Sequence, residues 1–100
     1  DKMKKAEYMM DHIGEVYDGI ISGVQEFGFF VELENTIEGL VKAESIKGDY
    51  YVFDNDLMAL IGKKSKKKYS FGDKVKVKVT RADKDRSEID FEIYDDKITK

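Results

Sequence analysis

The spacing of hydrophobic positions along the chain changes at Gly14. Before this residue, apolar side chains recur every three or four positions, at Met3, Ala6, Met9, Met10 and Ile13. Such spacing predicts a short amino-terminal helix over residues 2–13, and a glycine is typical of the position that ends a helix. A helix of this length is marginal in water by itself, so we expect it to pack on the rest of the chain or on a neighbouring domain.

After Gly14 the pattern is typical of β-strands, whose side chains point alternately to the two faces of a sheet. Five segments are predicted to be the main strands, at residues 15–24, 28–34, 38–42, 74–81 and 88–93. In the fourth of them we expect valines to point inward and lysines outward, and Gly19 and Gly23 in the first indicate bulges or bends. Short connections between five such strands favour a small closed barrel.

A longer segment separates the third strand from the fourth. Residues 50–53 and 57–61 flank a polar tip at 54–56, which predicts a hairpin excursion. A single helical turn is expected before the hairpin, at 43–46, and a lysine-rich loop after it. The sequence therefore predicts an all-β fold, a small closed five-stranded barrel, and barrels of this kind bind oligonucleotides across one sheet face and its adjoining loops.

Composition narrows the class of protein. The 100 residues suffice for one domain, and no apolar run approaches the roughly 20 residues of a membrane-spanning helix, so we expect no membrane partner. The absence of cysteine excludes disulfides and thiolate chemistry and fits a reducing, cytoplasmic compartment. Because the chain begins at Asp1 rather than Met, we expect it to be part of a longer protein; we also expect a monomer.

The distribution of charge matters more than the net charge of −3, which by itself argues against a nucleic-acid partner. Five lysines gather within six residues, at Lys63, Lys64, Lys66, Lys67 and Lys68, while acidic residues crowd between 83 and 96. The lysine segment has two interpretations. Either it follows a phosphate backbone, where such contacts give affinity without sequence information, or it is a solvated loop.

Phe30 is the most informative residue, because it shares a strand face with Glu32 and Glu34, which belong in water. Phe27 precedes the same strand closely enough to lie beside it. Two exposed rings on a sheet offer stacking surfaces to bases, at roughly 1–3 kcal/mol per base and with little dependence on base sequence. The alternative interpretation is that one or both rings cover the sheet or close an end of the barrel.

Six short motifs, in their order along residues 14–93, resemble the S1 RNA-binding domain. They are Gly14-Glu15-Val16, Gly19-Ile20-Ile21, Val24, Phe27-Gly28-Phe29-Phe30-Val31, Glu38-Gly39-Leu40-Val41 and Gly72-Asp73-Lys74-Val75-Lys76-Val77. The resemblance implies an S1-type OB barrel that binds single-stranded RNA with little sequence preference. In that family the two phenylalanines of the F-G-x-F-V motif stack on RNA bases, a role that falls here to Phe27 and Phe30.

The chain departs from the family's pattern at one position and is harder to align at another. The family usually carries a histidine after its G-L-V motif, where this chain has Lys42. A lysine meets a phosphate but does not stack like an imidazole. The family also places an aspartate and a basic residue in the turn before the last strand, which Asp83 and Arg86 match best. The resemblance therefore implies RNA contacts from Lys42, Asp83 and Arg86.

A second set of motifs resembles the carboxy-terminal S1 domain of the ribonuclease R family, which are bacterial 3′-to-5′ exoribonucleases. These motifs are Ala6-Glu7-Tyr8-Met9-Met10, Tyr50-Tyr51-Val52-Phe53-Asp54 and Ser87-Glu88-Ile89-Asp90-Phe91. The resemblance implies three parts: residues 1–13 as the helical tail of a preceding catalytic domain, 14–95 as the RNA-binding domain and 96–100 as a carboxy-terminal tail. It also implies that the catalytic domain of the parent chain is a partner and binds magnesium, and that this chain itself holds no cofactor.

No catalytic chemistry is predicted for the chain itself. Paired carboxylates at 54–56 and 83–85 lie on predicted turn tips that are open to solvent, and they lack the glycine and final glutamate of a calcium loop. The aromatic residues Tyr50, Tyr51 and Phe53 are interpreted as packing within the hairpin rather than as a second platform for bases.

The competing class of function is a protein-docking module of OB fold. The acidic final strand favours it, as do Glu32 and Glu34 on the strand of Phe30. The charge around the phenylalanines discriminates between the two classes, because basic neighbours indicate RNA and acidic neighbours indicate a basic protein partner.

Overall fold

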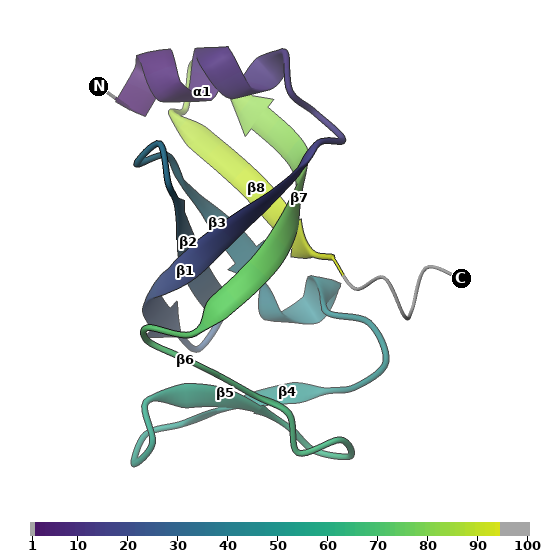
Figure 1. The fold of residues 1–100 in the computed structure, drawn as a ribbon. Coiled ribbons are helices and arrows are strands. Elements are labelled where there is room, and N and C mark those ends of the chain that lie inside the picture. The colour runs from purple at the N-terminus through teal and green to yellow at the C-terminus, as the bar shows by residue number, and fades with distance from the viewer. Residues whose placement is uncertain (1, 95–100) are drawn as a thin grey trace.

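Five strands close into a barrel in the computed structural model, which describes residues 2–94 (Figure 1). They are β1 (Val16–Gln25), β2 (Gly28–Leu33), β3 (Glu38–Lys42), β7 (Lys74–Asp83) and β8 (Glu88–Ile93). Their order around the barrel is β1-β2-β3-β8-β7, and β1 pairs with β7 to close it. Every barrel pairing is antiparallel except that of β3 with β8, which is parallel. The prediction of an all-β, five-stranded barrel is confirmed.

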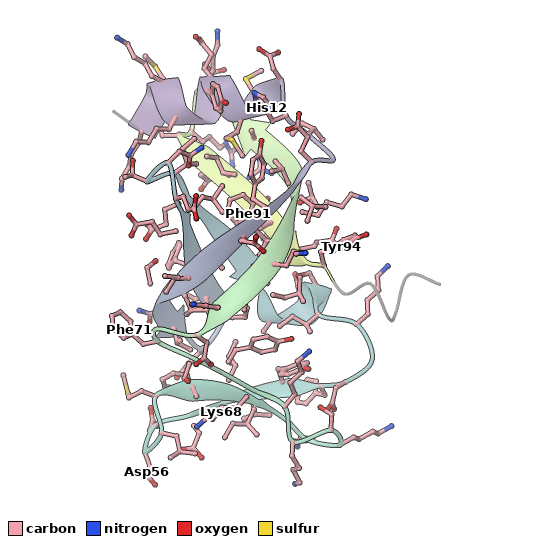
Figure 2. All side chains as sticks on the ribbon, viewed as in Figure 1. His12, Asp56, Lys68, Phe71, Phe91 and Tyr94 are labelled. Atoms are coloured by element: carbon pink, nitrogen blue, oxygen red, sulfur yellow. The ribbon has the colours of Figure 1, made fainter. Side chains whose placement is uncertain are left out.

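Alternation along the strands fills the barrel as predicted. Phe29 and Val31 of β2 are fully buried, as are Val77 and Val79 of β7. Phe91 of β8 belongs to the same core, and Figure 2 shows it inside the barrel. Full burial of one such side chain contributes roughly 1.5–3 kcal/mol to stability, so these positions dominate the cohesion of the barrel.

Two bulges interrupt this alternation. The pairing of β1 with β2 shifts between Ile21 and Gly23, so Ile21 and Val24 both lie in the core, which confirms the bend predicted at Gly23. The pairing of β7 with β8 shifts between Val79 and Arg81. A bulge adds one residue to a strand and thereby reverses the faces of the side chains that follow it. Arg81 is therefore exposed, where strict alternation from Val79 places it inside.

Helix α1 (Lys2–Met10) lies across one end of the barrel (Figure 1). Ala6 and Met9 on its inner face are fully buried in the same core as the strands, so the helix packs on the rest of the chain. The helix is shorter than the predicted 2–13. Beyond it the backbone tightens into turns, where the His12 amide donates to the Met9 carbonyl at 2.9 Å and Gly14 has a left-handed φ of 92°, which does not continue an α-helix.

The segment between β3 and β7 forms a smaller sheet at the opposite end of the barrel from α1 (Figure 1). A short 3₁₀ helix, η1 (Ala43–Ser45), leads to β4 (Tyr51–Asp54), β5 (Ala59–Gly62) and β6 (Lys68–Ser70). The predicted helical turn and hairpin are confirmed. The second strand of the hairpin begins later than the predicted residue 57, because Met58 has a left-handed φ of 50° and belongs to the turn.

The third strand of the smaller sheet, β6, carries Tyr69, whose side chain is buried in the core. Its ring stacks on Phe29, with 5.0 Å between centroids and 23° between planes, and Tyr51 packs on it at 5.5 Å. The buried ring fixes the strand that carries it. The prediction of a loop over the lysine-rich segment is therefore wrong at Lys68, which is the first residue of β6 and lies on the smaller sheet in Figure 2.

Candidate nucleic-acid interface

Phe27 and Phe30 form an edge-to-face pair on the outer surface of the barrel. Their ring centroids lie 6.3 Å apart, with 84° between the ring planes. Phe27 is 56% exposed and Phe30 is half-buried, and neither ring belongs to the core. The pair therefore presents aromatic surface to a ligand rather than filling the barrel.

The backbone around Gly28 sets the position of Phe27. Gly28 has a φ of 155°, and a side chain there would collide with the carbonyl oxygen of Val41 on β3. Only glycine permits the two strands to approach so closely. The Ala43 amide then donates a hydrogen bond of 2.9 Å to the Phe27 carbonyl. The backbone of Phe27 is thus anchored although its ring lies in solvent.

A groove of about 650 Å³ adjoins the aromatic pair. Lys42, which pairs with Gly28 across the β2–β3 ladder, contributes to its wall together with both phenylalanines. The basic residues that line it are Lys2, Lys5, Lys42, Arg81 and Arg86. The acidic residues that line it are Glu32, Glu38, Glu88 and Asp90. Charged residues of both signs thus surround the phenylalanines. The ion pairs among them determine which charges the groove leaves available to a ligand.

Arg81 neutralises part of the acidic charge in the groove. Its guanidinium lies 2.7 Å from Asp90, 3.2 Å from Glu88 and 3.5 Å from Asp83. Hydrogen bonds to Asp90 and then Glu88 raise the pKa of Arg81, so its positive charge is fixed. Sequence reasoning missed this residue as part of the site, because only the bulge in β7 turns it outward.

Asp83 and Arg86 lie together in the turn between β7 and β8. A carboxylate oxygen of Asp83 accepts hydrogen bonds from the backbone amides of Asp85 at 3.0 Å and Arg86 at 3.2 Å, which shapes the turn. The Arg86 side chain is 75% exposed, lines the groove and has a long contact of 3.9 Å with Asp83. Asp83 therefore serves the turn itself, whereas the guanidinium of Arg86 is accessible from the groove.

The lysine segment lies on the smaller sheet, and none of its five lysines lines the groove beside Phe30. Two of them cover tyrosine rings instead: the Lys63 ammonium lies 5.4 Å from the centroid of Tyr50, and the Lys67 ammonium lies 5.5 Å from that of Tyr69. At the groove the structure brings together only part of the predicted set, namely Phe27, Phe30, Lys42 and Arg86.

Asp49 holds the lysine segment in place. Its carboxylate accepts hydrogen bonds from the backbone amides of Lys64, at 3.0 Å, and Ser65, at 2.7 Å, and from the Ser65 hydroxyl, at 2.7 Å. The bond from the Ser65 amide is the main reason that the pKa of Asp49 lies well below its ordinary value. The segment is therefore an ordered structure with exposed lysine side chains.

The aromatic residues at the start of the smaller sheet differ in exposure. Tyr51 packs on Tyr69 and Phe53 packs against the core, so the interpretation as packing residues is confirmed for both. For Tyr50 it is wrong, because this residue precedes β4 and its side chain is 68% exposed.

Neither a metal centre nor a membrane-spanning helix is found within residues 2–94. No three His, Cys, Asp or Glu side chains in this range are placed to hold a metal ion. No helix in the range is long and apolar enough to cross a membrane.

The family model of the S1 RNA-binding domain matches residues 11–94. The chain belongs to this family. Curated relatives of this S1 domain include ribonuclease R 1 of Lactococcus lactis, 52% identical over 92 residues, and ribonuclease R of Ureaplasma parvum, 49% identical over 90 residues. These matches cover 92% and 90% of this chain but 11% and 12% of the relatives, so the S1 domain described here spans about a tenth of their length.

Comparison with solved structures also finds ribonuclease R. Mycoplasma genitalium ribonuclease R is known in an apo form and in complex with ribose-methylated single-stranded RNA. In both comparisons the TM-score is 0.87 and the identity 26%, over 93% of this chain and 15% of that one. The S1 domain is thus similar to ribonuclease R in sequence and in fold, which confirms the resemblance that its motifs indicate.

Proposed function

We propose that this S1 domain binds single-stranded RNA with little sequence preference, at Phe27, Phe30 and the groove beside them. The observation that carries the proposal is the exposed edge-to-face pair on an anchored backbone. Such rings stack with any base, because every base has a π-face. Lys42 and Arg86 in the groove wall supply positive charge for phosphates, and contacts of that kind weaken as salt rises.

The parent protein, in this proposal, is a 3′-to-5′ exoribonuclease of the ribonuclease R type. The support is the identity with ribonuclease R relatives and the RNA bound to the Mycoplasma genitalium enzyme. The S1 domain holds substrate for a catalytic domain, which belongs to another part of the parent chain and binds the magnesium. The division into 1–13, 14–95 and 96–100 stays a prediction, as do the monomeric state and the cytoplasmic location; residues 95–100 lie outside the described part of the chain.

A second candidate function is the docking of a basic protein. Glu32 and Glu38 in the groove favour it, because they place negative charge beside the phenylalanines. Against it stands the balance of charge in the groove, where five basic residues outnumber four acidic ones and Arg81 pairs with two of those acidic residues, Glu88 and Asp90. RNA is therefore the better fit to what the groove presents.

The test is an NMR titration of this chain with an unstructured RNA of about eight nucleotides, within the size range of an OB-fold site. Shifts should centre on Phe27, Phe30 and Lys42, with a dissociation constant on the order of 10⁻⁴–10⁻⁶ M at physiological salt, and should weaken as salt rises. Phe30→Leu keeps apolar bulk but removes the ring, so affinity should fall about 5- to 150-fold.

Phe71→Leu is the matched control. Phe71 is 73% exposed in the turn between β6 and β7 (Figure 2) and does not line the groove, so its substitution should leave affinity unchanged. If RNA shifts no resonance at low salt while a lysine-rich peptide does, the docking function is correct and the RNA function is wrong. Unchanged affinity in Phe30→Leu would contradict the stacking role.

A further inference from the structure

The groove beside Phe30 adjoins a second groove of about 640 Å³. Three residues line both grooves: Phe27, Leu40 and Lys42. The second groove extends from there to the segment that enters the smaller sheet, where Tyr50 forms part of its wall. The surface that presents the phenylalanine pair therefore continues from the barrel onto the excursion.

Tyr50 resembles Phe27 in its physical setting. Its side chain is 68% exposed, yet its backbone is anchored on both sides. The Tyr50 amide donates to Asp49 at 2.7 Å, and the Tyr50 carbonyl accepts from the Lys63 amide at 2.9 Å. A large exposed ring on a fixed backbone buries little of its own surface, so fold stability does not explain it. It does suit a ligand with a flat face.

A lysine beside Tyr50 places a positive charge next to this end of the second groove. The Lys63 ammonium lies 5.4 Å from the Tyr50 ring centroid. Asp49 lines the groove, and its carboxylate is engaged by the amides of Tyr50, Lys64 and Ser65 and by the Ser65 hydroxyl. Glu44 is the other acidic residue in its wall within the described part of the chain.

We propose that Tyr50 and Lys63 form a further nucleotide subsite, in which the Tyr50 ring stacks on a base and the Lys63 ammonium meets a neighbouring phosphate. The RNA strand then runs from Phe30 past Phe27 and Lys42 to Tyr50. This inference rests on the proposed RNA-binding function, and it identifies Tyr50 as the end of the path that the bound RNA strand follows on the surface. It also gives the lysine segment a role through Lys63, although that segment does not reach the first groove.

Oligonucleotide length separates this subsite from the phenylalanine pair. Affinities of oligouridylates of about 4 and about 10 nucleotides, which lie within the range of OB-fold sites, should be measured by fluorescence anisotropy. Tyr50→Leu should weaken the longer RNA about 5- to 150-fold, the loss expected for one stacked base, and leave the shorter RNA unchanged. Phe30→Leu should weaken both.

Two variants control for the ring and for general surface effects. Tyr50→Phe keeps the ring and should bind the longer RNA like the unmodified chain, and Phe71→Leu removes an exposed ring outside both grooves and should do the same. If Tyr50→Leu binds the longer RNA normally while Phe30→Leu does not, the subsite is wrong and the RNA-binding function stands. If Phe30→Leu also binds both lengths normally, the proposed function and this inference both fail.

Discussion

Phe27 and Phe29 are two positions apart and have opposite environments. Phe29 is fully buried beneath the ring of Tyr69, whereas Phe27 is 56% exposed beside Phe30. One residue thus belongs to the core and the other to the surface that we assign to RNA. The contrast allows the structural and the binding contributions of two nearby phenylalanines to be separated.

Phe27→Ala should change the free energy of unfolding by no more than about 0.5 kcal/mol, as at an ordinary surface position, while RNA affinity falls about 5- to 150-fold. Phe29→Ala should lower the free energy of unfolding by about 3–5 kcal/mol, because it opens a cavity in the core. Urea unfolding and an RNA titration of both variants measure the two effects. Equal destabilisation by both substitutions would show that Phe27 covers the sheet instead.

Negative charge in the groove should oppose RNA. Glu32 lines the groove beside Phe30, so Glu32→Gln should tighten RNA binding. An exposed charge interaction is worth about 0.2–1 kcal/mol, which corresponds to at most about a fivefold gain in affinity, larger at low salt. Glu34→Gln is the control, because Glu34 carries the same charge but does not line this groove. Weaker RNA binding by Glu32→Gln would favour the docking of a basic partner.

Much of the fold was predictable because its determinants are local. The alternation in β2 and β7 correctly assigns Phe29, Val31, Val77 and Val79 to the inside of the barrel. It also separates Phe30 from them, since a phenylalanine among glutamates on an outer face is out of keeping with burial. Alternation along a strand determines which face of the sheet each side chain occupies, and this is sufficient to place these side chains inside or outside the barrel.

The parts that sequence reasoning missed depend on contacts between distant segments. Arg81 points outward because of a bulge that forms only when β7 pairs with β8. Tyr69 makes β6 a strand through its stacking on Phe29, which is remote in sequence. Lys63 has its position because Asp49 orders the segment that follows it. A lysine-rich stretch indicates charge, but the contacts of its backbone decide where that charge lies.

Asp49 should contribute stability that depends on pH. Its pKa is lowered in the folded state, so its contribution is present above the ordinary pKa of about 3.9 and is lost as pH falls through the lowered value. Asp49→Asn should therefore destabilise the chain at about pH 7, and the difference from the unmodified chain should narrow below about pH 4. Urea unfolding at several pH values measures this.

Asp85→Asn is the control for the loss of one negative charge, because Asp85 is exposed in the turn between β7 and β8. It should change the free energy of unfolding by no more than about 0.5 kcal/mol. Amide exchange supplies a local readout for Asp49→Asn, since asparagine has one uncharged acceptor oxygen in place of two carboxylate oxygens, and the amides of Lys64 and Ser65 should therefore exchange faster. A pH-independent difference between Asp49→Asn and the unmodified chain would contradict the assigned hydrogen bonds.

Gly28 should be intolerant of any side chain, whereas Gly23 should accept one. A Cβ at Gly28 would collide with the Val41 carbonyl, and the φ of 155° is strained for any other residue, so Gly28→Ala should cost about 1–3 kcal/mol of unfolding free energy. It should also displace Phe27 and weaken RNA binding. A Cβ at Gly23 meets only the Phe30 ring at 3.9 Å, so Gly23→Ala should change stability by about 0.5 kcal/mol or less. Similar urea midpoints for the two variants would mean that β2 and β3 do not approach as closely at Gly28 as described.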